Sequence, residues 1–273
     1  MSDTEKEPAQ EARDEPLVEG TLLSHLVELR TRLMRSMIAA GLLAIPCLAF
    51  ANELFEWVTV PLRKQLPAGS SMIATSVVAP FMTPFKLALV AAIFLAMPYI
   101  LYQLWAFVAP GLYRHERRFA LPLLVSSVIL FYVGAAFAYF AVFPVMFQFF
   151  ISTTPAGVSM MTDMTQYLDF VVLLFFAFGL AFEIPVAIVL LVRTGLVNLD
   201  SLGKRRGFVV LGVFVLAAIL TPPDAVSQTM MAVPMYALFE VGILMARILN
   251  RGVLARRAAE KEAEDEEGGA SSA

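Results

Sequence analysis

Long uninterrupted runs of apolar residues constrain the fold of this chain more than any other feature. A helix needs about 20 residues to cross the hydrocarbon core of a bilayer, and the backbone there must satisfy its own hydrogen bonds. The apolar residues lie in continuous runs rather than in the alternating pattern of barrel strands. They make up 59% of the 273 residues. The sequence therefore predicts an all-α integral membrane protein.

Six transmembrane helices are predicted from these runs. The fifth has about 14 residues and would be only about 21 Å long, against a hydrocarbon core of about 30 Å. A short span of this kind can be accommodated by local thinning of the bilayer. The predicted spans are 34–50, 85–108, 119–143, 167–192, 207–220 and 227–249.

The distribution of positive charge predicts the orientation of these spans. Seventeen of the 20 Lys and Arg residues fall on one side of the predicted topology, and only Arg63, Lys64 and Lys86 fall on the other. Cytoplasmic flanks collect Lys and Arg, so both termini are expected in the cytoplasm. Residues 1–20 and 251–273 are polar and charged, as is typical of disordered tails. Residues 21–250 form the expected membrane domain.

A cleaved signal peptide is the alternative for the first span. Residues 49–51 (Ala-Phe-Ala) match the small-x-small cleavage pattern. The polar stretch before the span exceeds thirty residues, which is too long for an ordinary signal-peptide n-region. We therefore expect the first span to be retained.

Prolines predict a curved, concave bundle rather than a straight one. Pro98, Pro185 and Pro234 lie inside predicted spans, where each removes a backbone hydrogen bond and can bend its helix. Pro144 should kink the third helix, whose apolar run continues to residue 151. The outer segment 52–84, which includes Pro61, is expected to form a cap of short helices. Asp224 ends the tight turn that joins the last two spans.

Several classes of chemistry have no support in the sequence. Cys47 is the only cysteine, so no intramolecular disulfide can form, and the two histidines do not belong to a cluster with metal-ligand spacing. There is no glycine-rich phosphate loop, nucleophile elbow or catalytic triad. We expect no metal, cofactor, enzymatic activity or nucleic-acid partner.

Two acids on the predicted cytoplasmic side are candidate binding residues. Glu28 and Glu116 lie among arginines in short segments next to hydrophobic spans. Local pairing is one interpretation, because Arg32 is four residues from Glu28 and Arg117 and Arg118 follow Glu116. The alternative is that both carboxylates bind guanidinium groups of a partner, which carboxylates accept in a bidentate manner.

Polar residues inside the predicted spans form a second set of candidates. Glu183 is interpreted as the only deep ionisable group, and a charge there costs at least a few kcal/mol unless it pairs, is protonated or faces water. It either bonds to a neighbouring helix or lines a polar groove. Thr221 and Gln228 either join helices within the chain or recruit another membrane helix. Glu240, nearer the cytoplasmic end, is expected to snorkel to the membrane surface or to pair with Arg247.

Five motifs resemble the TatC family of the twin-arginine protein translocase, over about residues 20–250 and in the same order. They are His25-Leu26-Val27-Glu28-Leu29-Arg30, the proline at Pro61, the run from Tyr102 to Tyr113 that leads into His115 and Glu116, Phe182-Glu183-Ile184-Pro185, and Leu220-Thr221-Pro222-Pro223-Asp224.

The resemblance implies a receptor in the bacterial inner membrane. The family recognises paired-arginine signal peptides of folded cargo, works with TatA and TatB single-span partners and other TatC copies, and uses the proton-motive force without a nucleotide. The family's recognition acids fall on Glu28 and Glu116, and its intramembrane glutamate falls on Glu183. Thr221 and Gln228 fall where partner helices dock. The residues expected to shape the recognition patch are Arg30, Phe107, Leu112, Tyr113 and His115.

Two other functional classes are weighed against the receptor. A proton-coupled small-solute transporter would use Glu183 as a relay, but a single deep carboxylate and the absence of an internal repeat disfavour it. A purely structural scaffold would use none of these acids for binding.

Overall fold

The computed structural model describes residues 19–65, 71–108, 120–155, 158, 161–221, 224–250 and 252. These residues are almost entirely helical, with one isolated β-bridge between Ile73 and Asp163. The helical elements are α1 (Glu19–Ala49), α2 (Ala51–Gln65), α3 (Ala79–Val108), α4 (Ala120–Phe137), the π-helix η3 (Ala138–Val142), α5 (Phe143–Ser152), α6 (Met164–Ala181), α7 (Ile184–Arg193), α8 (Leu199–Lys204), α9 (Arg206–Leu220) and α10 (Ala225–Leu249).

The predicted fold class is confirmed. Within the described residues, five helical stretches are long and apolar enough to cross a membrane, and α9 is the shorter sixth apolar helix that the sequence predicts. The five long stretches are Ser24–Ala49, Ala79–Val108, Leu121–Ser152, Met164–Arg193 and Ala225–Leu249.

Two helices extend beyond the predicted spans. The first helix begins at Glu19 instead of residue 34, because the charged segment before the apolar run is already helical. The second long helix begins at Ala79 instead of residue 85. Among the described residues of segment 52–84, the predicted cap of short helices is represented by α2, and the end of the segment belongs to α3. Hydropathy marks the part of a helix that lies in lipid, not the full length of the helix.

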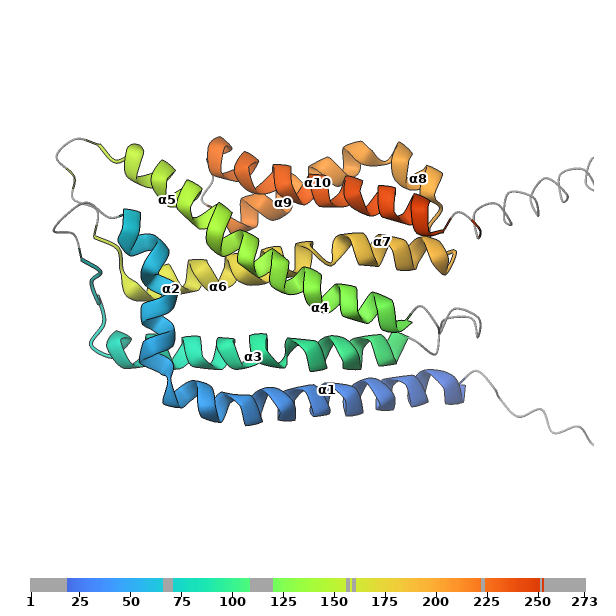
Figure 1. The fold of residues 1–273 in the computed structure, drawn as a ribbon, viewed down its shortest axis with the longest axis horizontal. Coiled ribbons are helices and arrows are strands. Elements are labelled where there is room, and N and C mark those ends of the chain that lie inside the picture. Colours follow the sequence, from blue (N-terminus) through green and yellow to red (C-terminus); the bar gives the residue numbers. More distant parts are fainter. Residues whose placement is uncertain are drawn as a thin grey trace, which may run out of the picture.

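The helices run roughly along one axis (Figure 1). Helix α1 packs on α3, α4 packs on α6, and α10 packs on α7 and α9. The rod formed by α4, η3 and α5 crosses the bundle diagonally (Figure 1). Helix α2 lies across one end of the bundle. The starts of α1, α4 and α9 and the ends of α3, α7 and α10 lie at the opposite end. We call the end at which α2 lies the cap end, and the opposite end the terminal end.

Prolines interrupt two of the helices. Pro144 lacks the N–H that would bond to Phe140, and the chain passes through η3 just before it, with the Phe143 N–H bonded to the Ala138 carbonyl. At the predicted break, the third span thus passes through η3 into the separate helix α5. Its extension beyond the bilayer stays a prediction. Pro185 leaves the Ala181 carbonyl without a helical donor, and α6 ends there before α7 begins at Ile184.

Asp163 ties the cap end together. Its carboxylate accepts hydrogen bonds from the backbone N–H groups of Thr165 and Gln166, which makes it the N-cap of α6. It also accepts from the Thr75 N–H at 3.0 Å and the Thr75 hydroxyl at 2.7 Å. Hydrogen bonds from Gln166 and Thr75 lower the pKa of Asp163 from 3.8 to about 2.

Candidate functional site

Glu28 lies on α1 near the terminal end, where its side chain is about one third exposed. Arg32 Nη2 donates to Glu28 Oε1 at 2.6 Å and Arg32 Nε donates to the same oxygen at 2.9 Å. Arg32 Nη1 also donates to Oε1 of the buried Gln103 on α3 at 3.3 Å. The predicted pairing of Glu28 with Arg32 is therefore confirmed, and it leaves Glu28 Oε2 on the side that faces His25.

A stacked ring pair connects this part of α1 to the end of α3. The His25 and Phe107 rings are 4.2 Å apart, centroid to centroid, and almost parallel. Arg30 is exposed on α1, and Phe107 is half-buried. Phe107 is followed after one residue by segment 109–119. The predicted site residues Leu112, Tyr113, His115 and Glu116 all belong to that segment, and they lie outside the described residues.

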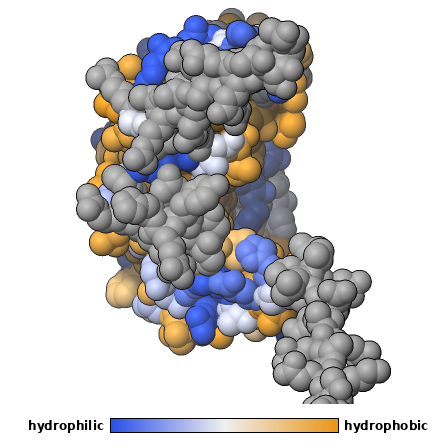
Figure 2. Space-filling view, turned by 90° about the vertical axis from the view of Figure 1, so that its right-hand side faces the viewer, coloured by the Kyte–Doolittle hydropathy of each residue, from blue (hydrophilic) through white to orange (hydrophobic). Residues whose placement is uncertain are grey.

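The terminal end also carries most of the described positive charge. Figure 2 looks onto this end and shows hydrophilic residues on it with hydrophobic residues around the rim. The Arg206 guanidinium here is 2.8 Å from Oε2 of Glu240, whose Oε1 accepts a hydrogen bond from the Tyr236 hydroxyl. The predicted Glu240–Arg247 pair is wrong, because α9 places Arg206 beside the acid. Spacing along one helix does not reveal a partner on another.

Glu183 lies at the break between α6 and α7. Ser127 of α4 is near this acid, and Ser127 Oγ accepts a hydrogen bond from Trp105 Nε1 of α3 at 3.2 Å. Glu183 Oε1 is buried and has no hydrogen-bond partner among the described residues. One buried acceptor of the acid thus remains unsatisfied beside the hydrogen bond that joins α3 to α4.

Glycines in two neighbouring helices lie against the residues on either side of Glu183. A Cβ on Gly134 of α4 would lie 2.5 Å from the Phe178 carbonyl and 2.9 Å from the Phe182 ring. A Cβ on Gly242 of α10 would lie 3.0 Å from Pro185 Cα. Both helices can therefore approach the broken segment closely.

An apolar cavity of about 420 Å³ opens between α1, α2, α3, α4, η3 and α6. We call it the concave cavity. Glu183 is not among its lining residues, so the sequence-based expectation that this acid lines a groove is not supported by the cavity's walls. The walls include Cys47, Trp57, Phe94, Tyr132, Tyr139 and Phe175.

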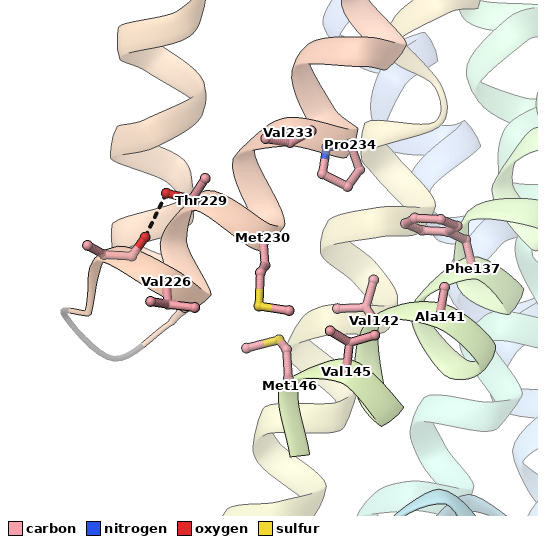
Figure 3. Close-up of a pocket in the computed structure, with 11 residues that line it drawn as sticks. Phe137, Ala141, Val142, Val145, Met146, Val226, Thr229, Met230, Val233 and Pro234 are labelled. Atoms are coloured by element: carbon pink, nitrogen blue, oxygen red, sulfur yellow. Dashed lines mark hydrogen bonds between the residues drawn. The ribbon is translucent and has the colours of Figure 1, made fainter. Parts of the chain in front are cut away.

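A second hollow of about 630 Å³ separates the rod of α4, η3 and α5 from the start of α10. We call it the α10 groove; its walls include Phe137, Val142, Met146, Val226, Met230 and Pro234. Met230 and Met146 face each other across it (Figure 3). Flexible, polarisable methionines adapt to different apolar surfaces.

The polar residues predicted for this region bond mainly within the chain. Gln228 Nε2 donates to the Phe214 carbonyl at 2.9 Å and so joins α10 to α9. The Thr221 hydroxyl donates to the Ala217 carbonyl of its own helix. Asp224 accepts from the Ser227 N–H at 2.7 Å and caps α10. Gln228 therefore joins two helices within the chain, whereas the Thr221 bond stays within α9. Recruitment of a partner helix by these residues stays a prediction.

The sequence interpretation missed one ionic contact within the spans. Lys86 of α3 forms an ion pair with Asp169 of α6, and both side chains are half exposed. Lys86 was predicted at the outer end of the second span, and Asp169 at the start of the fourth, but hydropathy does not pair residues of different helices. A lysine and an aspartate near the same ends of two apolar runs were the available signal.

Comparison with known proteins decides the family. The family model described as Sec-independent protein translocase protein (TatC) matches residues 24–234. The chain belongs to the TatC family. The TatC protein of Azotobacter chroococcum mcd 1 is 56% identical over 231 residues, which cover 84% of this chain and 91% of that protein. The TatC of Escherichia coli K12 is 53% identical over 226 residues, covering 83% and 88%.

Solved TatC structures have the same fold. A crystal structure of the twin arginine translocase receptor TatC is 35% identical, with a TM-score of 0.74, and the match covers 82% of this chain and 98% of that one. A second crystal structure of that receptor, in DDM, has a TM-score of 0.75. This TatC is thus a twin-arginine translocase protein and a multi-pass protein of the inner membrane. The small-solute transporter alternative is set aside.

Proposed function

We propose that this TatC is the receptor for paired-arginine signal peptides of folded proteins, and that Glu28 and Glu116 bind the two guanidinium groups. The observation that carries the proposal is the position of Glu28: a partly exposed carboxylate beside a stacked His25–Phe107 pair. Arg32 uses only Oε1, and a carboxylate can accept from guanidinium groups at both oxygens. Arg30, Phe107, Leu112, Tyr113 and His115 complete the proposed patch.

Chain length allows the two acids to meet. Phe107 is in contact with His25, which precedes Glu28 by less than one helical turn. Nine residues connect Phe107 to Glu116, and an extended chain of nine residues spans at most about 30 Å. A folded segment of this length can bring Glu116 back toward Glu28. The solved relatives described as twin arginine translocase receptors support the same ligand class.

The proposed orientation places the terminal end in the cytoplasm. The first described helix begins at this end and the last one ends at it, and eight described Lys and Arg residues belong to this end or its helix flanks. By the positive-inside rule, this end faces the cytoplasm and α2 faces the opposite compartment. The eight Lys and Arg residues at the terminal end are Arg30, Arg32, Arg35, Arg193, Lys204, Arg205, Arg206 and Arg247. We also propose 1–20 and 251–273 as tails and 21–250 as the membrane domain.

The two apolar hollows suggest where the next steps take place. We propose that the apolar part of the signal peptide enters the concave cavity, whose walls are almost wholly apolar. The α10 groove, next to Gln228, suits one face of a single-span TatA or TatB helix. Without water as a competitor, close packing and a few hydrogen bonds drive such helix association. Glu183 and Thr221 are proposed to assist partner docking, and further TatC copies to join the assembly.

Photo-cross-linking to a twin-arginine peptide tests the receptor proposal. A photoreactive residue at position 27, next to Glu28, should capture the peptide, and the Glu28→Lys/Glu116→Lys variant should lose this product. Replacing the peptide's two arginines with glutamines should have the same effect. Unchanged capture by the double-lysine variant would disprove the role of the two acids.

Partner docking requires a separate experiment. A photoreactive group at Val226, which lines the α10 groove, should capture a TatA- or TatB-type helix in membranes. Leu42 of α1 is a suitable control, since it is an exposed apolar residue on a different helix. Equal capture from both positions would indicate random collisions in the bilayer and would argue against a docking groove.

A further inference from the structure

Two tyrosine hydroxyls of the diagonal rod bond to main-chain carbonyls of two other helices. Tyr139 of η3 donates to the Trp57 carbonyl of α2 at 3.0 Å. Tyr132 of α4 donates to the Phe94 carbonyl of α3 at 2.8 Å. All four residues line the concave cavity. One rod is thus hydrogen-bonded to both helices that form the opposite wall.

Each of these carbonyls lies four residues before a proline of its own helix. In an α-helix, the carbonyl of residue i accepts the N–H of residue i+4, and proline has no N–H to donate. Trp57 precedes Pro61 within α2, and Phe94 precedes Pro98 within α3. Both carbonyls have therefore lost their helical donor, and an unpaired carbonyl is costly in an apolar environment.

We infer that Tyr132 and Tyr139 are positioning residues that replace the two hydrogen bonds removed by Pro98 and Pro61. Each pair forms a lock between the diagonal rod and one proline-containing helix. The prolines free an acceptor that only a neighbouring helix can satisfy, so the locks specify how α2 and α3 sit against the rod. They thereby fix the shape of the concave cavity. Its use for an apolar peptide segment rests on the proposed function; the locks themselves do not.

Tyr167 provides a matched control within the same region. Its hydroxyl donates to the Val58 carbonyl of α2 at 2.8 Å. Val58 precedes Leu62 by four residues, and Leu62 has an N–H. This tyrosine therefore also ties α2 to the bundle, but its bond does not compensate for a proline.

Cys47 is a built-in reporter of the cavity wall. It is the only cysteine of the chain, is 6% exposed, and packs with Ala88 and Ala92 of α3 and with Leu54 of α2. If a lock is released, α2 or α3 should separate more often from the rod and the thiol should react faster with a maleimide. The rate can be measured on the purified full-length chain without any peptide.

The test is a double-mutant cycle. Tyr139→Phe keeps the ring stacked on Trp57 and removes only the hydroxyl, and we expect it to speed labelling about threefold to tenfold, as for loss of an interhelical hydrogen bond. Pro61→Ala restores the missing N–H, so Tyr139→Phe should change the rate less than about twofold in that background. The Tyr132→Phe and Pro98→Ala pair should behave in the same way.

Several outcomes would overturn the inference. One is an equal effect of Tyr139→Phe on the rate of Cys47 labelling in the wild-type and Pro61→Ala backgrounds. Another is no effect on this rate in either background. A third is that Pro61→Ala also cancels the effect of Tyr167→Phe on the rate. If Tyr139→Phe alone fails to fold, recovery of folded protein by Pro61→Ala/Tyr139→Phe supports the lock, and failure of both overturns it. Peptide capture next to Glu28 is measured separately, so failure of the receptor proposal would leave this result intact.

Discussion

Arg32 and Glu28 are joined by two hydrogen bonds to a single carboxylate oxygen, from Nε at 2.9 Å and from Nη2 at 2.6 Å. The same arginine reaches Gln103 of α3 through its third nitrogen. Arg32 is therefore held in place by two helices. A guanidinium group from outside that binds Glu28 must share the carboxylate with Arg32 or displace it.

We therefore predict opposite effects of two neutral substitutions. Glu28→Gln should weaken binding of a twin-arginine peptide about tenfold, the loss expected for one charge-assisted hydrogen bond of about 1.4 kcal/mol. Arg32→Gln should strengthen binding a few-fold, because it removes the internal competitor. Peptide binding measured by fluorescence anisotropy at low ionic strength would test this.

Arg35→Gln is the charge-matched control, since Arg35 is exposed on the same helix. It should change affinity less than Arg32→Gln, and high salt should reduce any effect it has. If Arg32→Gln weakens the peptide complex as much as Glu28→Gln does, Arg32 supports the ligand instead of competing with it.

Close packing at Gly134 gives a second prediction. The Cβ of Gly134→Ala would lie 2.5 Å from the Phe178 carbonyl, and main chain cannot move aside cheaply. We expect this change to destabilise the protein by about 1–3 kcal/mol, as in overpacked cores. Gly212→Ala has open space around it and should be neutral or slightly stabilising, because alanine favours helix. Thermal unfolding in detergent would compare the two; equal melting temperatures would contradict the close approach of α4 and α6.

The sequence predicted the spans well because lipid imposes a simple rule on them. A membrane helix must be apolar along its length, and the runs around α3, α6 and α10 show this directly. The start of α1 was missed because residues 19–33 are helical outside the apolar region. The pairing of Glu240 with Arg206 was missed because the two residues come from different helices. Contacts between helices depend on rotation and register, which hydropathy does not determine.

The sequence predicted which residues of the candidate site carry its chemistry, but not which residues of other helices they contact. Charge patterns singled out Glu28, and burial in an apolar run singled out Glu183. The i,i+4 spacing predicted the Arg32 contact. Nothing in the linear pattern predicts that Gly134 of α4 packs against Phe178 and Phe182 beside Glu183, because these segments meet only in the folded protein. The motif-based expectation at Glu116 remains a proposal.

A pH dependence is expected at the cap end. Hydrogen bonds from Gln166 and Thr75 lower the pKa of Asp163 from 3.8 to about 2. A lowered pKa stabilises the fold above the unfolded-state value near 3.8, and this contribution is lost as the pH falls toward about 2. Asp163→Ala removes the α6 cap and should lower the melting temperature by about 2–4 °C near neutral pH.

The difference between wild type and Asp163→Ala should shrink as the pH is lowered from about 4 to about 2, because the wild-type carboxylate is then protonated. Thr75→Val removes one of the donors and should give a smaller difference with the same trend. Melting curves over this range would check it. A difference that stays constant with pH would show that the cap acts without its charge.

The last prediction separates a structural from an interactive role of Glu183. Ser127→Ala leaves the buried Trp105 N–H without its acceptor and should cost about 1–3 kcal/mol, visible as a lower melting temperature. Glu183→Gln retains the size and polarity of the side chain, so the free energy of unfolding should stay within about 0.5 kcal/mol of the wild-type value. If Glu183 assists docking, Glu183→Gln should still reduce cross-linking of a partner helix to the photoreactive group at position 226. Ser127→Ala should reduce this cross-linking only in proportion to the loss of folded protein. Full capture and export with both Glu183→Gln and Glu183→Ala would assign the acid to packing alone, with the α10 groove acting independently of it.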